Sequence, residues 1–409
     1  MADVAVLDVL LHNEPIGTLT NVGGDRTIFA FDDAYIDDPD RPTLGLGFKD
    51  EFGALLTDFR PYQTRVMPFF SNLLPEGHLR AYLAEKARIN EEREFYLLWA
   101  LGRDLPGAVT IRPADGETWP PDLGKEDGGG QPQRENALRF SLAGVQLKFS
   151  AVQEASGGLT IPASGVGGSW IVKLPSRDYT GVPENEFSMM RLADLIGMNV
   201  PAIDLVDIGA IGNIPKGIDR IGGKAFVIRR FDRLEDGTSV HIEDFAQIYG
   251  VYAEDKYKNA SMRSIARVLA AEGNDADITE FIRRLTFNAL IGNGDMHLKN
   301  WSLIYPDRRN VSLAPAYDFV STIPYISGEE YALNISRSKA FADFSEDELS
   351  HLAARAALPE KLVLETARET VVLFHQHWNA EKTELPMSDE VRAAIEAHLK
   401  TVPIAHHSL

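Results

Sequence analysis

The sequence reads Ile291-Gly-Asn-Gly-Asp295-Met-His-Leu-Lys-Asn300 in its second half, and Ala316-Tyr-Asp318-Phe follows it. Phosphoryl transfer requires a carboxylate that orients the attacking hydroxyl, and oxygen ligands that hold Mg²⁺ on the phosphates. Asp295 and Asn300 have the Asp-x-x-x-x-Asn spacing of a protein-kinase catalytic loop, and Asp318 opens an Asp-Phe pair. Because Mg²⁺ prefers hard oxygen donors, the pattern predicts that Asp295 orients the hydroxyl while Asn300 and Asp318 bind the metal.

Each of these residues also has an ordinary interpretation. An Asp-x-x-x-x-Asn match is expected about once by chance in a chain of this size. Asn293-Gly-Asp295 is equally typical of a turn, and a single histidine such as His297 is more often structural than a ligand. The catalytic interpretation therefore depends on the combination with Asp318 and on the order of elements along the chain.

A glycine-containing segment, Phe140-Ser141-Leu-Ala-Gly144-Val-Gln-Leu-Lys148-Phe149, forms a second motif. Its alternating flanks predict a hairpin, and backbone amides at a glycine turn bind anions such as phosphates. One glycine between two strands most often marks only a turn, so this motif by itself leaves both interpretations open.

A lysine within an apolar strand forms the third motif, Trp170-Ile-Val-Lys173-Leu-Pro, and Pro183-Glu184-Asn-Glu186 follows it. A buried lysine is costly unless it is paired, so Lys173 could point at ATP phosphates while Glu186 holds it. The alternative is a solvent-facing lysine on an edge strand, with Glu184 and Glu186 favourable near a helix N-terminus.

The fourth motif, Phe226-Val-Ile-Arg229-Arg230-Phe231-Asp-Arg233, stands where strands give way to helices. A hinge there would present backbone groups to adenine and Phe231 to its ring. A plain strand end with salt-bridged arginines explains the motif comparably well.

The first part of the chain predicts a compact α/β unit over residues 1–112, with helices at 76–83 and 91–101. Residues 113–135 are rich in Gly, Pro, Asp and Glu, which is typical of a linker or a mobile loop.

Strands dominate the range 136–236, apart from a helix predicted over 186–196, and helices dominate 237–409. Ser345-Glu-Asp-Glu348 predicts a capping box at a late helix, and Ser388 can cap the last one. A strand-rich part followed by a helical part is the order of an α+β, two-lobed phosphotransferase.

Composition limits the possible partners. The 409 residues are 44% apolar, which allows two or three domains or lobes. There is no cysteine, which excludes disulfides and thiolate zinc sites. The net charge of −19 should repel DNA and anionic membranes, so nucleic-acid contact would need a basic patch or a basic partner. No apolar run has the length of a membrane span and no signal peptide is evident, so we expect a soluble, cytoplasmic protein.

Taken in order, the motifs resemble the HipA family of toxin–antitoxin kinases. That family places a Ser-x-Ala-Gly-x-Gln loop before an Ile-Lys-Leu-Pro strand and Asn-Glu in a helix. An Arg-Phe-Asp-Arg hinge, Asp-x-His-x-Lys-Asn and a Tyr-Asp pair follow. The corresponding segments here are Ser141–Gln146, Val172–Pro175, Asn185-Glu186, Arg230–Arg233, Asp295–Asn300 and Tyr317-Asp318. Phe70–Gly77 and Gly102–Val109 match as well, so the resemblance covers nearly the whole chain.

The resemblance implies a protein-kinase-like two-lobed fold with an extra N-terminal α/β subdomain and a helical C-terminal lobe. The subdomain would be 1–112, the nucleotide-binding N-lobe 136–236 and the C-lobe with the catalytic loop 237–409. It implies that Asp295 is the catalytic base, that Asn300 and Asp318 hold Mg²⁺, and that Glu186 supports Lys173. The residues implied to contact ATP are Ala143, Gly144, Val145, Gln146, Leu147, Lys148, Lys173, Arg229, Arg230, Phe231, His297, Lys299 and Tyr317.

The resemblance also implies partners and regulation. Ser141 matches a loop serine whose autophosphorylation inactivates family members. The implied partner is a basic helix-turn-helix antitoxin of the HipB type, through which alone the chain would reach operator DNA. The implied substrate is a protein, an aminoacyl-tRNA synthetase.

Departures from the family pattern leave alternatives. Arg229 stands where glutamate is common, and the catalytic loop has Met and Leu where Gly and Ala are usual. A small-molecule kinase of the choline or aminoglycoside type would use a similar Asp, Asn and Asp arrangement. A corepressor scaffold without turnover is the non-enzymatic alternative.

Overall fold

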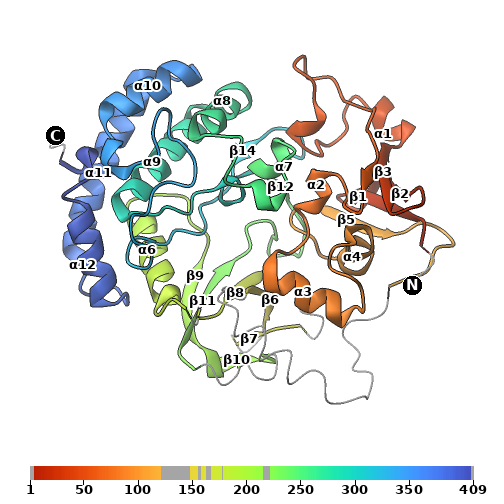
Figure 1. Cartoon of the computed structure of the whole chain (residues 1–409), viewed down its shortest axis with the longest axis horizontal. Helices are drawn as coiled ribbons and strands as arrows, with labels where there is room; N and C mark the ends of the chain where they lie inside the picture. The colour runs from red at the N-terminus through yellow and green to blue at the C-terminus, as the bar shows by residue number, and fades with distance from the viewer. Residues whose placement is uncertain are drawn as a thin grey trace.

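The computed structural model describes residues 4–120, 148–154, 158–162, 167–176, 178–214 and 222–406. Figure 1 shows the N-terminal unit on one side, the C-terminal helices on the other, and a second sheet below and between them. The α+β class expected from the sequence is confirmed. Among the described residues no helix is long and apolar enough to cross a membrane.

The N-terminal unit is built on an antiparallel sheet with the strand order β4-β3-β2-β1-β5. The strands are β1 (Val6–Leu11), β2 (Glu14–Asn21), β3 (Arg26–Phe31), β4 (Tyr62–Gln63) and β5 (Val109–Pro113). The helices are α1 (Asp33–Asp37), α2 (Pro68–Ser71), α3 (Gly77–Lys86) and α4 (Glu94–Leu101), and a 3-10 turn covers Leu46–Phe48. Alternate residues of β1 are buried in an apolar cluster confined to this unit, which explains the period-2 pattern of the sequence.

The second sheet has the order β10-β7-β6-β8-β11-β9. Its strands are β6 (Lys148–Gln153), β7 (Leu159–Thr160), β8 (Trp170–Lys173), β9 (Ile203–Asp207), β10 (Ile211–Gly212) and β11 (Lys224–Arg229). The helix α6 (Val182–Leu195) packs on β9 and β11, and Gly197 follows it with a φ of 83° that favours glycine. Because β8 is paired on both edges, with β6 and β11, its residues cannot lie on an edge strand.

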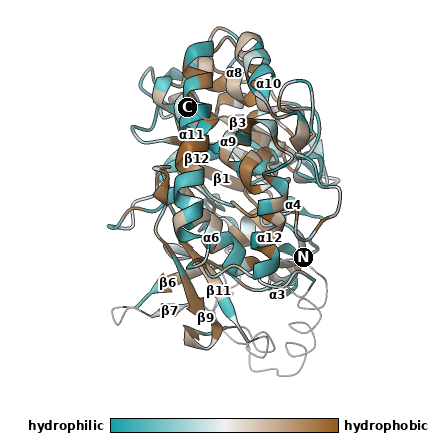
Figure 2. Ribbon diagram, turned by 90° about the vertical axis from the view of Figure 1, so that its left-hand side faces the viewer, coloured by the Kyte–Doolittle hydropathy of each residue, from teal (hydrophilic) through white to brown (hydrophobic). Residues whose placement is uncertain are grey.

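The C-terminal part is helical but begins with a small sheet that the sequence did not predict. That sheet has the order β12-β13-β14, formed by His241–Asp244, Ser302–Tyr305 and Ser312–Leu313. The helices are α7 (Phe245–Ile248), α8 (Met262–Glu272), α9 (Asp275–Ile291), α10 (Glu346–Ala356), α11 (Glu360–Glu381) and α12 (Asp389–His398). A large apolar cluster joins these helices to α6, while hydrophilic residues mark the outward turns of α6 and α12 in Figure 2.

One predicted cap is confirmed and another is only half correct. Ser388 caps α12 by accepting the backbone N–H of Val391 at 3.3 Å. Ser345 likewise accepts the N–H of Glu348, but the Glu348 carboxylate does not complete the capping box. Its Oε2 accepts Arg337 Nε at 2.7 Å and its Oε1 accepts the backbone N–H groups of Ser336 and Arg337, because a buried carboxylate gains more from a cation and several amides than from one amide at the cap.

Among the described residues, one apolar cluster is confined to the N-terminal unit, a second lies in the second sheet, and the large third one spans the C-terminal helices, α6 and part of β11. The separate N-terminal cluster supports the boundary after residue 112, and the division into 1–112, 136–236 and 237–409 stays a proposal. Of the predicted linker 113–135, Pro113 belongs to β5, and residues beyond 120 lie outside the described ranges.

Candidate active site

The end of α9 and the loop after it fix the position of Asp295. Gly292 ends the helix in the left-handed region, with a φ of 66°, and a side chain there would collide with Ile323. The buried Asn293 side chain then ties the loop together. Its Nδ2 donates to Asn288 Oδ1 at 2.7 Å, and its Oδ1 accepts the backbone N–H of Asp295 at 3.1 Å. The Asn293 side chain therefore fixes the loop both to the end of α9 and to the backbone at Asp295.

The carboxylate of Asp295 is half exposed and accepts one described hydrogen bond, from the hydroxyl of Tyr257 at 2.8 Å. Burial chiefly raises the pKa of Asp295, and the Tyr257 hydrogen bond opposes that rise. Asn300 lies at the other end of the loop, where its Nδ2 donates to the backbone carbonyl of Asp295 at 2.7 Å. That bond leaves the amide oxygen of Asn300 without a described hydrogen bond, so it is available to a cation.

Asp318 is held in a left-handed conformation, with a φ of 59°, beside two lysines. It forms ion pairs with Lys173 and, at 3.4 Å, with Lys148 of β6. Burial by itself would raise the pKa of Asp318, but Lys148 and Lys173 hold that pKa far below its ordinary value. A non-glycine residue kept at positive φ and in a cluster of charges is typical of a functional position.

Lys173 forms a second ion pair with Glu186 of α6. The two residues are 4% and 0% exposed. Burial by itself would lower the pKa of Lys173, but Asp318 and Glu186 raise it, so the ammonium stays charged. β8 lies within the sheet, and Lys173 projects from it toward Glu186 of α6, which packs on the neighbouring strands β9 and β11. The charge is stable there only because both carboxylates accompany it.

The loop of Asp295 and the segment of Asp318 are joined directly. Asn293 Nδ2 also lies 3.4 Å from the backbone carbonyl of Asp318. One side chain thus connects the candidate base to the candidate metal ligand. The donor set, one carboxylate and one amide oxygen, fits Mg²⁺, which keeps several waters.

The predicted hinge residues have side chains bound to acids. Arg230 is buried and binds Asp232 at 2.8 Å and Asp104 at 3.3 Å. Arg229 lies 3.4 Å from Glu235. Their side chains thus match the salt-bridged alternative, and their contacts with ATP stay a prediction.

The ring of Phe231 lies 5.7 Å from that of Tyr317, centre to centre. The hydroxyl of Tyr317 binds Ser302 at 2.5 Å and the backbone carbonyl of Lys299 at 2.9 Å. The two rings form an aromatic pair beside the catalytic loop, consistent with a site for a base ring.

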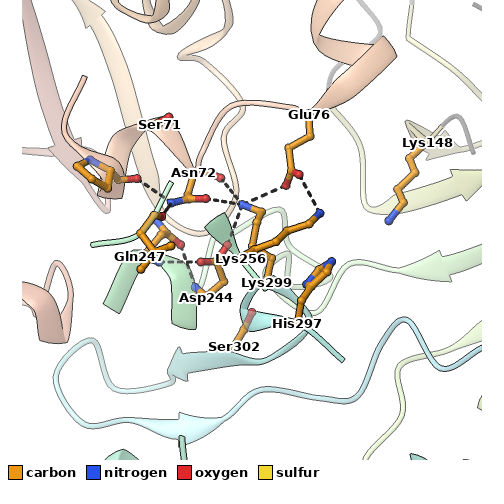
Figure 3. Close-up of polar contacts among 12 residues, drawn as sticks. Ser71, Asn72, Glu76, Lys148, Asp244, Gln247, Lys256, His297, Lys299 and Ser302 are labelled. Atoms are coloured by element: carbon orange, nitrogen blue, oxygen red, sulfur yellow. Dashed lines mark hydrogen bonds and ion pairs between the residues drawn. The ribbon is translucent and has the colours of Figure 1, made fainter. Parts of the chain in front are cut away.

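The side chain of Lys299 is engaged with the N-terminal unit. Its ammonium lies 3.0 Å from Asn72 Oδ1, 3.0 Å from Asp244 and 3.5 Å from Glu76. Figure 3 shows these residues gathered around the lysine. His297 lies beside this group, and burial lowers its pKa to about 3, so the imidazole is neutral. The described contacts of Lys299 are structural, and a role toward ATP for either residue stays a prediction.

Part of the predicted site lies outside the described residues. This applies to Ser141 and to Ala143, Gly144, Val145, Gln146 and Leu147. Lys148, which follows them at the start of β6, is described and reaches Asp318.

Sequence reasoning missed Tyr257, Lys256 and Glu76, which contact the catalytic loop from other parts of the chain. Glu76 lies in Leu73-Leu-Pro-Glu-Gly77, a segment that the family resemblance covers, so that segment was the available signal. Tyr257 lies in a polar loop with no motif, and nothing in the sequence singles it out.

The fold and this cluster of charges define the class: the protein has a protein-kinase-like fold with an additional N-terminal unit. Profiles of known families agree with that class. The HipA N-terminal domain matches residues 7–112, and the HipA-like C-terminal domain matches residues 140–378.

Comparison with individual relatives agrees with these family matches. A protein of Sinorhizobium fredii named as a candidate kinase, Y4dM, is 59% identical over 407 residues, which cover 99% of this chain and 98% of the relative. The serine/threonine-protein kinase toxin HipA of Shewanella oneidensis is 26% identical over 384 residues, which cover 83% of each chain. The solved structure of the Shewanella HipA, HipB and operator DNA complex aligns with a TM-score of 0.72 at 22% identity, covering 98% of this chain and 96% of that one. The chain belongs to the HipA-like kinase family.

Proposed function

We propose that this chain is an ATP-dependent serine/threonine protein kinase and the toxin of a HipBA-like toxin–antitoxin module. The observation that carries the proposal is the connection of Asp295 to Asp318 through Asn293, with Lys173 and Lys148 on the carboxylate of Asp318. A base and a cation-binding carboxylate held side by side among phosphate-binding lysines meet the needs of phosphoryl transfer.

Each residue then has a defined task. Asp295 accepts the hydrogen bond of a serine or threonine hydroxyl and takes its proton as that oxygen bonds to the γ-phosphorus. The bond from the γ-phosphorus to the bridging oxygen breaks, and ADP leaves. Lys173 and Lys148 bind the phosphates, and Glu186 keeps Lys173 oriented. Asn300 and Asp318 would hold Mg²⁺, which would supply positive charge to the phosphates.

The finer parts of the proposal rest on the family. We propose autophosphorylation at Ser141 as an inhibitory step, since a phosphate there adds about −1.5 to −2 charges near the phosphate-binding lysines. The Shewanella relative was solved with HipB and operator DNA. A basic antitoxin of that type suits a chain with a net charge of −19. An aminoacyl-tRNA synthetase is the proposed substrate, and the cytoplasm the proposed location.

The test is transfer of labelled phosphate from Mg²⁺-ATP to the purified chain and to added proteins, with the Asp295→Asn variant as the control. We expect labelled protein with the wild type, and mass spectrometry should locate phosphate at Ser141. Label on choline or an aminoglycoside but on no protein would favour the small-molecule alternative. ATP turnover absent from the wild type would favour the scaffold.

A further inference from the structure

The loop before α8 lies against the catalytic base. Tyr257 is 44% exposed, yet its hydroxyl donates to Asp295 Oδ1 at 2.8 Å. Its ring packs against His297 in a T-shaped arrangement, with the ring centres 5.1 Å apart. The tyrosine therefore contacts two side chains of the catalytic loop, Asp295 and His297.

A kinase base must present one carboxylate oxygen to the acceptor hydroxyl in a fixed orientation. Among the described residues, Tyr257 makes the only hydrogen bond to the carboxylate of Asp295. Asn300 binds the backbone carbonyl of Asp295 instead, and His297 Nε2 is 3.9 Å from Oδ1, beyond hydrogen-bond distance. Since the tyrosine occupies Oδ1, Oδ2 is left for the acceptor.

The N-terminal unit holds the loop of Tyr257 in place. Glu76, at the start of α3, binds Lys256 at 3.0 Å and lies 3.5 Å from Lys299, and Figure 3 shows it reaching both lysines. These lysines hold the pKa of Glu76 below its ordinary value although burial opposes them. The backbone carbonyl of Lys256 accepts the N–H of Leu298 at 3.2 Å, which fastens the loop to the catalytic loop as well.

We infer that Tyr257 is a positioning residue for Asp295, and that Glu76 of the N-terminal unit keeps the loop of Tyr257 in place by binding the neighbouring Lys256. The inference rests on the proposed kinase function and deepens it. It makes the N-terminal unit a contributor to the geometry of the catalytic base. The acceptor hydroxyl enters beside the Tyr257 ring, which forms one wall of its site.

The experiment measures single-turnover phosphate transfer from labelled Mg²⁺-ATP, with the chain itself and dephosphorylated casein as acceptors. The variants are Tyr257→Phe, which keeps the ring, Glu76→Gln, and both together. Tyr62→Phe, in β4 of the N-terminal sheet, is the matched control for loss of a phenol hydroxyl. Thermal unfolding of each variant establishes that it is folded.

Misplacement of a catalytic group by a fraction of an ångström lowers the rate steeply, so Tyr257→Phe should reduce the maximal rate about tenfold. The ATP concentration for half-maximal rate should stay unchanged, because Tyr257 acts on the acceptor side. Glu76→Gln should give a smaller decrease, and the double variant should be no slower than Tyr257→Phe, since both act through one route. Lys256→Arg should retain the rate and Lys256→Met should lower it.

A Tyr257→Phe variant as fast as the wild type would overturn the inference, and so would a faster one, which would make Tyr257 a plug over the base. Additive losses in the double variant would overturn the role of Glu76. A wild type that transfers no phosphate would refute the proposed function, and the inference with it. The two failures are thus distinguished by the wild-type reaction.

Discussion

The buried carboxyl of Glu243 makes the stability of this protein depend on pH. Glu243 lies on β12, fully enclosed where the helical part meets the N-terminal unit. Its Oε1 accepts the backbone N–H of Leu46 at 2.9 Å and the hydroxyl of Tyr305. Its Oε2 has no described hydrogen-bond partner and lies against Gly45. Burial chiefly raises the pKa of Glu243 to about 7, so the proton it keeps belongs on that unpartnered oxygen.

The size of this effect on stability follows from the pKa shift of Glu243. A rise from 4.5 to about 7 corresponds to about 3 kcal/mol of preference for the protonated carboxyl in the folded state. The folded protein binds this proton more tightly than the unfolded chain does. Its contribution to stability is therefore full below pH 4.5 and is lost as the pH rises through about 7. Glu243→Gln removes the titration, so the variant should gain stability relative to the wild type between pH 5 and pH 8.

Urea unfolding of both proteins at intervals across that range is the assay, with Glu360→Gln on the exposed first turn of α11 as the control. The difference in unfolding free energy between the wild type and Glu243→Gln should change by up to about 3 kcal/mol in favour of the variant. A difference that stays constant with pH would show that Glu243 is ionised in the folded state throughout, and the reasoning would be wrong.

Three further predictions concern the charged cluster. Asp295→Asn should reduce phosphate transfer by orders of magnitude and leave nucleotide binding intact, as measured by label transfer beside equilibrium binding of ATP. Asp318→Ala should weaken the binding of Mg²⁺-ATP, measured by calorimetry, more than the binding of ATP without the metal. Lys173→Met should destabilise the protein by about 3–5 kcal/mol, because Glu186 loses its cation, and a thermal-unfolding comparison with Lys173→Met/Glu186→Gln should show partial recovery. An unchanged unfolding temperature in the single variant would contradict the last prediction.

The part of the site that the sequence could predict is the part made of contiguous motifs. Asp295 and Asn300 lie in one loop, and Lys173 stands on a strand whose neighbours are apolar. Such residues keep their relation to the backbone whatever surrounds them, so spacing and residue type are sufficient to predict that they lie together in one loop or on one strand. Their roles stay predictions. The α+β class followed in the same way from local strand and helix patterns.

The partners of individual side chains could not be predicted, because they come from distant segments. Lys299 meets Asn72, and Arg230 meets Asp104, across more than a hundred residues of sequence. A cationic side chain in a nucleotide-binding motif was expected to face phosphates. In the structure, polar groups of the N-terminal unit bind these cationic side chains instead. Sequence periodicity predicts helices and strands but does not show which distant polar group a side chain will bind. The small sheet of β12 and β13 was missed for the same reason, because its strands are short and far apart in the chain.

These distant contacts share one feature, since each joins the N-terminal unit to another part of the chain: the predicted hinge, the catalytic loop or β12. Asp104 holds the hinge through Arg230, Asn72 and Glu76 hold the catalytic loop through Lys299, and Leu46 binds Glu243. Desolvated polar contacts add little net stability, but a shifted arrangement leaves them unpaired at high cost. These contacts therefore select one orientation of the N-terminal unit on the rest of the chain, and they add little to how tightly it is held. A unit attached only for partner binding would not need such contacts at the hinge, at the catalytic loop and at β12. Their distribution is the physical basis for expecting a change at Glu76 to reach Asp295.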